Sequence, residues 1–139
     1  MILLDTNVLI YAFDSDSPLG EWARETIAGA VAGDGAAISA VSLAELCVGD
    51  ADPPTVADRV RSWGVVIVDV PAAAAEPCGR AYRGYRKRRR SSPGTAVPTM
   101  PLPDFFIGAH AEVMRWELAT ADRGRFKTYF PSVELRMPD

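Results

Sequence analysis

Residues 2–10, ILLDTNVLI, carry the strongest fold signal in this 139-residue chain. Ile2-Leu3-Leu4 is a short apolar run that predicts a buried strand, and Asp5 ends it. Residues 6–13 then have the apolar spacing of a helix with one face toward a core. An acid therefore stands where a strand meets a helix, a place where Asp is also among the best N-cap residues. From this stretch alone, Asp5 can be interpreted either as an N-cap or as a functional carboxylate.

Short apolar runs alternate with helical patterns along the rest of the chain. We expect further strands at 36–39, 65–68 and 118–120, and an edge strand at 133–135. We expect helices at 18–31, 41–48, 53–63, 72–90 and 104–116, a turn or short helix at 122–126, and a loop at 91–103. This alternation predicts an α/β fold with a parallel sheet covered on both faces, and residues 1–139 are expected to form a single domain.

Composition excludes several classes of protein. Hydrophobic residues make up 48% and charged residues 24% of the chain, which is typical of a soluble globular domain without membrane contact. Cys47 and Cys78 form no close pair, which suits reduced thiols in the cytoplasm rather than a zinc site or a disulfide framework. The first residues lack the basic segment of a signal peptide. His110 is the only histidine, so mechanisms that need two histidines are excluded within one chain.

Some large side chains are assigned to packing rather than to chemistry. His110 lies six residues after Asp104, about 240° around a helix, and so is expected to point away from that acid. The other residues expected in the core lie on apolar helix faces: Trp22, Ile27, Val31, Trp63 and Trp116.

Glu45 is the most informative acid on physical grounds. It is the only charged residue in the apolar segment 36–48, AAISAVSLAELCV, and Glu is almost never fully buried without a partner. One interpretation is a capping box, because Ser42 and Glu45 fit the S-x-x-E pattern of a helix start. The other places the helix start at Ser39, which leaves the Glu45 carboxylate free deeper in the helix.

Asp104 and Asp122 also stand at junctions of predicted elements. Asp104 stands at the start of a helix, where an N-cap is the alternative interpretation. Asp122 lies just past a strand, where a turn residue is the alternative interpretation. Ligands of open parallel sheets bind beyond the carboxyl ends of the strands, so Asp5 and Asp122 are expected at the same rim. If all four acids face one crevice, their repulsion favours bound Mg²⁺ or Mn²⁺, which prefer carboxylate and water oxygens.

The motifs LLDTNVLI, an acid at 45, LPDFFIGAHA at 102–111 and ATADRGRF at 119–126 resemble, in this order, the PIN domain. More narrowly they resemble VapC-type toxins of bacterial toxin–antitoxin pairs, and the resemblance covers nearly the whole chain. It implies a PIN-like three-layer α/β/α sandwich with a central, mainly parallel sheet of about five strands. It also implies Mg²⁺- or Mn²⁺-dependent endoribonuclease activity, a small VapB-like antitoxin as partner, and a homodimer.

The resemblance also assigns roles to residues by position. Asp5, Glu45, Asp104 and Asp122 match the acidic quartet that serves as catalytic and metal-binding residues in similar toxins. Asp5 and Asp104 would bind the metal directly, and Glu45 and Asp122 directly or through water. Thr6, Asn7 and Ser39 match supporting polar residues, with Asn7 expected to orient the Asp5 carboxylate.

The stretch 86–103 departs from the family pattern, because it is longer and more basic than expected before the LPD motif, and it overlaps a basic segment at 80–90. Net charge is −3, yet residues 80–90, RAYRGYRKRRR, hold seven of the 15 basic residues, and the other 128 residues carry a balance of −10. Tyr82 and Tyr85 could stack on unpaired RNA bases. The candidate contacts to the RNA backbone are the five cations of residues 86–90: Arg86, Lys87, Arg88, Arg89 and Arg90. A solvated charge run, or a surface for an acidic part of an antitoxin, is the alternative.

Two other classes of function compete with a nuclease. Phosphoryl transfer through an aspartate nucleophile fits poorly. A dehalogenase-like phosphatase needs a second acid two residues after Asp5, and Asn7 stands there. A receiver domain needs a pair of acids beside the first strand, and that pair is missing. The non-enzyme alternative is a PIN-like module with an idle site that binds RNA or a partner protein. The sequence leaves the RNA target, the antitoxin and the number of metals open.

Overall fold

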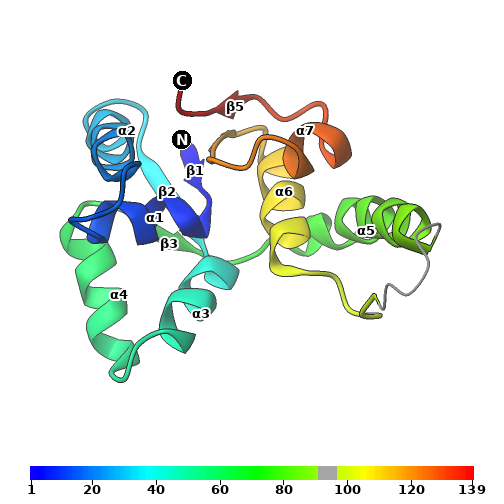
Figure 1. Ribbon diagram of the computed structural model, residues 1–139, viewed down its shortest axis with the longest axis horizontal. Helices are drawn as coiled ribbons and strands as arrows, with labels where there is room; N and C mark the ends of the chain where they lie inside the picture. Colours follow the sequence, from blue (N-terminus) through cyan, green and yellow to red (C-terminus); the bar gives the residue numbers. More distant parts are fainter. Residues whose placement is uncertain (91–96) are drawn as a thin grey trace.

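A single five-stranded sheet forms the centre of the computed structural model, which describes residues 1–90 and 97–139 (Figure 1). Its order is β3-β2-β1-β4-β5, and every neighbouring pair is parallel. The strands are β1 (Ile2–Leu4), β2 (Ala36–Ser39), β3 (Val66–Val68), β4 (Glu117–Ala119) and β5 (Leu135–Arg136). The predicted α/β class with five strands is confirmed, and the parallel pairing is complete rather than partial.

Alternation along the central strands creates two cores, one on each face of the sheet. Leu3 packs in one cluster, while Ile2 and Leu4 pack in the other, because successive strand residues point to opposite faces. The Leu3 side is covered by the short 3-10 turn Ala72–Ala74 and by the helices α5 (Ala75–Arg90), α6 (Pro103–Met114) and α7 (Arg125–Tyr129). The other face is covered by α1 (Thr6–Phe13), α2 (Gly20–Ala32), α3 (Ala40–Val48) and α4 (Pro53–Ser62).

The strand order determines where a ligand could bind. The chain runs outward from β1 to β2 and β3 on one side, and then crosses to β4 and β5 on the other side. The crevice of such a sheet lies beyond the carboxyl ends of the two strands where the order reverses, here β1 and β4. Asp5 follows β1 and Asp122 lies three residues past β4, so the rim predicted from the sequence is the rim that the topology defines.

The number of helices in the described residues agrees with the prediction, but some helices begin or end at other residues than predicted. Residues 6–13 form α1 with the predicted bounds, whereas α2 begins at Gly20 rather than at 18. The core assignment of Val31 is wrong, because its side chain is 38% exposed. The last short helix, α7, spans 125–129 instead of 122–126, because the residues before it form a turn around Asp122.

Helix α5 extends to one side of the sheet and carries the basic segment (Figure 1). It is continuous from 75 to 90 despite Gly79 and Gly84, and Pro77 lies in its first turn, where a missing backbone N–H is tolerated. The predicted loop at 91–103 falls partly outside the described residues, and its described part ends where Pro103 begins α6. Among the helices that the structure describes, none is long and apolar enough to span a membrane.

Candidate active site

Asp5 is a buried carboxylate that does not serve as a helix cap. It is 3% exposed and occupies the N-cap position of α1, but its side chain accepts no capping hydrogen bond. Instead, Thr120 Oγ1 donates to Asp5 Oδ2 at 2.9 Å. Burial raises the pKa of Asp5 to about 7, and the charges of Asp104 and Glu45 add to the rise, while the Thr120 hydrogen bond and the adjacent Thr6 backbone amide oppose it. Asp5 is thus electrostatically coupled to two of the other predicted acids.

Glu45 lies within α3 rather than in its first turn. Ser39 is the N-cap, and its Oγ accepts the backbone N–H of Val41 at 3.1 Å. The capping-box interpretation through Ser42 is therefore wrong, and the alternative start at Ser39 is confirmed. The Thr6 hydroxyl donates to Glu45 Oε1 at 2.6 Å and lies 3.0 Å from the Ser42 hydroxyl, so the carboxylate is held toward the end of β1.

Asp104 is partly exposed in the first turn of α6 and pairs with a cation. Leu102 occupies the N-cap position, so Asp104 is not the cap that the sequence left open. Arg125 Nη1 lies 2.7 Å from Asp104 Oδ2, and the two side chains are 29% and 28% exposed. Nothing in the sequence spacing indicated this pair, because Arg125 comes from α7, 21 residues further along the chain.

Asp122 forms the turn that precedes α7. Its Oδ1 accepts the backbone N–H groups of Gly124 at 2.9 Å and Arg125 at 2.8 Å. Its own backbone N–H donates to Thr120 Oγ1 at 3.0 Å, and this hydroxyl also holds Asp5. The turn interpretation is confirmed, and Asp122 lies at the same rim as Asp5. A metal-binding role for Asp122 stays a prediction.

The supporting residues differ in how they relate to the acids. Thr6 and Ser39 are buried, the first against Glu45 and the second at the start of α3. Asn7 is exposed, and the structure gives Asp5 a different side-chain partner, Thr120. Thr120 is the residue that sequence reasoning missed, and its only signal was its place two residues before Asp122.

The carboxylate groups of the site have the chemistry that a hard divalent cation prefers, although they are not gathered at the spacing of a metal site. In the described parts of the chain, no three His, Cys, Asp or Glu side chains are gathered closely enough to hold a metal ion. Asp5, Glu45 and Asp104 nevertheless act on one another, since the charges of the latter two raise the pKa of Asp5. Carboxylate oxygens are the ligands that Mg²⁺ and Mn²⁺ prefer. A cation among these acids would offset both their repulsion and the burial of Asp5.

The aromatic and basic residues next to Asp104 also differ from expectation. Tyr82 is 3% exposed and its hydroxyl donates to the Pro98 carbonyl at 2.6 Å, so stacking of Tyr82 on an RNA base is excluded. Tyr85 is half-buried, and its ring contacts Phe105 at 5.2 Å between ring centroids. His110 is 1% exposed beside Trp116, which confirms its assignment to packing.

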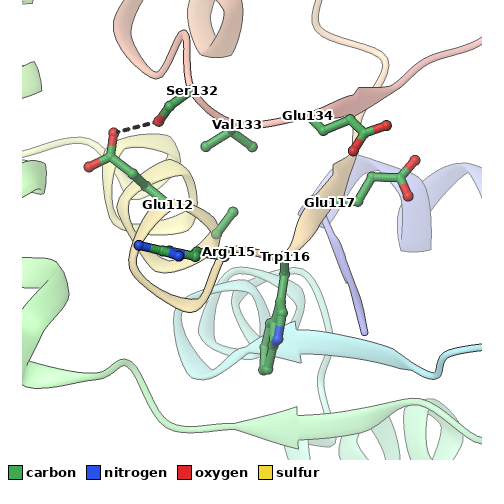
Figure 2. Close-up of a pocket in the computed structure, with 8 residues that line it drawn as sticks. Glu112, Arg115, Trp116, Glu117, Ser132, Val133 and Glu134 are labelled. Atoms are coloured by element: carbon green, nitrogen blue, oxygen red, sulfur yellow. Dashed lines mark hydrogen bonds between the residues drawn. The ribbon is translucent and has the colours of Figure 1, made fainter.

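A second acidic region lies at the opposite end of the sheet, around a pocket of about 500 Å³ (Figure 2). Glu117 begins β4, whereas the crevice lies past the end of that strand. Glu117 pairs with Arg136 at 2.8 Å, and Glu112 pairs with Arg80 at 3.0 Å. Ser132 also donates to Glu112 at 3.3 Å, as the dashed line in Figure 2 shows. These acids are paired at the surface, unlike the buried Asp5.

Fold and site together define an α/β protein with a buried acid and further acidic side chains near it, at the point where the order of a parallel sheet reverses. The PIN domain family matches residues 2–130 of the chain. The chain therefore belongs to the PIN domain family. No curated protein matches it significantly.

Solved structures with the same fold come from toxin–antitoxin complexes. VapBC2 from Rickettsia felis, crystallised with a promoter DNA fragment, matches with a TM-score of 0.68 and 21% identity over 100% of both chains. DNA-bound VapBC from Salmonella typhimurium matches with a TM-score of 0.69 and 22% identity, over 98% of this chain and 96% of that one. A toxin–antitoxin complex from Klebsiella pneumoniae matches with a TM-score of 0.58 and 26% identity, over 96% and 95%. The fold predicted from the sequence motifs is confirmed.

Proposed function

We propose that the chain is a Mg²⁺- or Mn²⁺-dependent endoribonuclease that acts in the cytoplasm as the toxin of a toxin–antitoxin pair. The observation that carries this proposal is the coupling of three carboxylates from three elements. Burial of Asp5 after β1 raises its pKa to about 7, and the nearby charges of Asp104 in α6 and Glu45 in α3 add to the rise. Such a group of acids is costly to keep without a cation, so its placement at the sheet crevice indicates a metal-binding use.

The proposed roles follow from the surroundings of each acid. Asp5 and Asp104 would bind the divalent cation directly, and Glu45, held by Thr6, would bind it or position a water molecule. Asp122 would act through water, since its Oδ1 already accepts two backbone N–H groups. When bound, the cation supplies Lewis acidity toward the phosphodiester and lowers the pKa of a bound water. Thr120 would help to position the Asp5 carboxylate, because its hydroxyl donates to Asp5 Oδ2.

Helix α5 offers a surface for the RNA backbone. Arg86, Lys87 and Arg90 line a groove of about 550 Å³, together with Arg83 one turn earlier. On another side of the helix, the guanidinium of Arg89 lies 5.9 Å from the Tyr85 ring centroid. We propose that these cations, with Arg88, contact RNA phosphates, which would give a salt-dependent affinity.

The partner proposals rest on the solved structures of similar fold. The matching chains from Rickettsia felis and Salmonella typhimurium were crystallised as VapBC complexes with DNA. We propose a small VapB-like antitoxin as the partner of this chain, and a homodimer as its assembly. Co-expression with the product of the neighbouring upstream reading frame, followed by purification and light scattering, tests both proposals.

The decisive experiment compares Asp5→Asn with Glu117→Gln. Both variants replace a carboxyl group by its amide, but Glu117 lies at the amino end of β4, away from Asp5. We expect Asp5→Asn to lower the rate of RNA cleavage in Mg²⁺ by at least about 10³-fold, because it removes a ligand of the charge-stabilising cation. Glu117→Gln should stay within about twofold of the parent chain, since exposed ion pairs contribute little. Sequencing RNA ends after pulse expression of each variant gives the cut sites.

The alternative function, an idle module that binds RNA or protein, makes the opposite prediction. Asp5→Asn would then leave RNA or antitoxin affinity unchanged, and the parent chain would release no RNA fragments in Mg²⁺ or Mn²⁺. Cleavage that survives in Asp5→Asn would instead overturn the proposed mechanism while leaving a nuclease of another kind.

A further inference from the structure

Arg125 is fixed at the rim of the crevice by the turn that precedes it. Its backbone N–H donates to Asp122 Oδ1 at 2.8 Å. The backbone N–H of Asp122 donates to Thr120 Oγ1 at 3.0 Å, and Thr120 in turn donates to Asp5 at 2.9 Å. The start of α7 and the buried carboxylate at the end of β1 are therefore joined by three consecutive hydrogen bonds. The position of Arg125 is tied to the site itself rather than to a separate surface.

The guanidinium of Arg125 is held between an acid and two aromatic rings. Nη1 lies 2.7 Å from Asp104 Oδ2, and Cζ lies 5.3 Å from the Tyr85 ring centroid and 5.6 Å from that of Phe105. Both distances are within the range of cation–π attraction. The side chain of Arg125 is 29% exposed, so the guanidinium is partly desolvated and still reachable from solvent. The rings hold the guanidinium beside the site independently of its bond to Asp104.

Arg125 is the one cation within 4.0 Å of any of the four predicted site acids among residues 1–90 and 97–139. It contacts one carboxylate oxygen of Asp104, which is a proposed ligand of the divalent ion. A divalent ion on Asp104 and the guanidinium at 2.7 Å from the same carboxylate would repel each other strongly in a half-buried site. Binding one cation at Asp104 therefore weakens the binding of the other.

We propose that Arg125 is a further functional residue of this site: it neutralises Asp104 in the metal-free chain, gives way to the divalent cation, and then binds a phosphate oxygen of the RNA. The inference rests on the proposed function. The guanidinium fork is suited to this exchange, because it stays charged at any physiological pH and bonds carboxylate and phosphate oxygens in the same geometry. Tyr85 and Phe105 keep it near the crevice when its bond to Asp104 is released.

The first arm of the test measures Mn²⁺ affinity by calorimetry in the full chain without RNA. We expect R125Q to bind Mn²⁺ more tightly than the parent, on the order of fivefold, because the competing cation is removed. K127Q is the matched control, since Lys127 is an exposed cation of the same helix, and its Mn²⁺ affinity should stay within about twofold of the parent. Unchanged or weaker Mn²⁺ binding by R125Q would overturn the proposed competition.

Two further variants identify the route. In a D104N background, R125Q should give no additional gain in Mn²⁺ affinity, because the carboxylate for which both cations compete is absent. R125K keeps the charge but loses the flat fork, so its Mn²⁺ affinity should lie between those of the parent and R125Q. A gain that persists in D104N, or an R125K affinity equal to that of R125Q, contradicts competition of charge at Asp104. Backbone NMR chemical shifts of residues 125–129 confirm that α7 is intact in each variant.

The second arm measures RNA cleavage at saturating Mn²⁺. We expect R125Q to lower kcat/KM by about tenfold or more, because a charged hydrogen bond to phosphate is lost, while K127Q stays within about twofold. Tighter Mn²⁺ binding together with slower cleavage is a pair of opposite effects that damage to α7 would not produce. Undiminished cleavage by R125Q overturns the phosphate role. If the parent chain binds Mn²⁺ but cuts no RNA, the proposed function and the phosphate role fail, and the calorimetry still decides the competition.

Discussion

The two acidic ends of the sheet differ in how their charges are compensated. At the amino end of β4, Glu117 and Glu112 are matched with Arg136 and Arg80 on the surface. At the carboxyl end of β1, Asp5 is buried with a hydroxyl as its side-chain partner, and its pKa rises to about 7. Surface pairs keep acids charged at little cost, whereas the crevice keeps an acid where its charged form is disfavoured. This contrast supports the proposed cation site at the carboxyl end of β1 rather than at the amino end of β4.

The largest expected difference between the two ends is in the pH dependence of stability. The folded-state pKa of Asp5, about 7, lies above its ordinary value of 3.8. The folded chain therefore binds more protons than the unfolded chain between these pH values, and its stability falls as pH rises from about 4 to 7. For Asp5 this loss is on the order of 4 kcal/mol. Asp5→Asn should abolish the loss in urea unfolding, so its advantage over the parent grows with pH.

Glu117→Gln is the control for this measurement. Its unfolding free energy should run parallel to that of the parent chain between pH 4 and 8, offset by about 1 kcal/mol or less. Saturating Mn²⁺ should also remove the loss in the parent, because a bound cation favours the charged form of Asp5. A parent chain whose unfolding free energy does not change between pH 4 and 8 would contradict the raised pKa of the buried Asp5.

A smaller effect is expected from the hydroxyl groups that donate to acids at the two ends. Thr120→Val removes the donor to Asp5 and leaves the backbone N–H of Asp122 without its acceptor. Above pH 7 the unfolding free energy should fall by about 1–3 kcal/mol, and the pKa of Asp5 should rise further, because its charged form loses a hydrogen bond. Carbon NMR of the Asp5 carboxyl group follows that pKa directly.

Ser132→Ala removes the corresponding donor to Glu112 at the exposed end of the sheet. Water replaces the lost hydrogen bond there, so the change in unfolding free energy should stay within about 0.5 kcal/mol. Equal losses in Ser132→Ala and Thr120→Val would remove the distinction between a buried and a surface acid.

Sequence reasoning located the elements well where the signal was local. The apolar run before Asp5 and the β-branched run ending at Val68 were sufficient for β1 and β3, because strand formation follows from nearby residues. Asp5 and Glu45 could be singled out because each is an acid beside or inside an apolar segment. The turn at Asp122 was also a local pattern, and it was among the interpretations left open.

Long-range contacts were the part that the sequence could not predict. Thr120 bonds Asp5 across 115 residues, and Arg125 bonds Asp104 across 21. The first contact depends on β1 and β4 being neighbours in the sheet, and the second depends on the packing of α7 near the start of α6. The error at Tyr82 has the same origin, since its burial comes from α6 and from the segment containing Pro98. Periodicity indicates that one face of a helix is apolar, but not what covers it.

The smallest expected effect concerns the ion pairs of the two ends. Arg136 contacts Glu117 through two nitrogens, at 2.8 and 3.2 Å, with side chains 44% and 22% exposed. A double-mutant cycle of Arg136→Gln and Glu117→Gln should give a coupling energy of about 0.5 kcal/mol, falling toward zero in 1 M salt because exposed charges are screened. The Arg125–Asp104 pair is covered by two rings, so its coupling should be larger, about 1 kcal/mol or more, and less sensitive to salt. If the Arg136 pair instead shows the larger and more salt-resistant coupling, then Arg125 is no better held than a surface arginine, and the crevice loses its distinction from the paired end of the sheet.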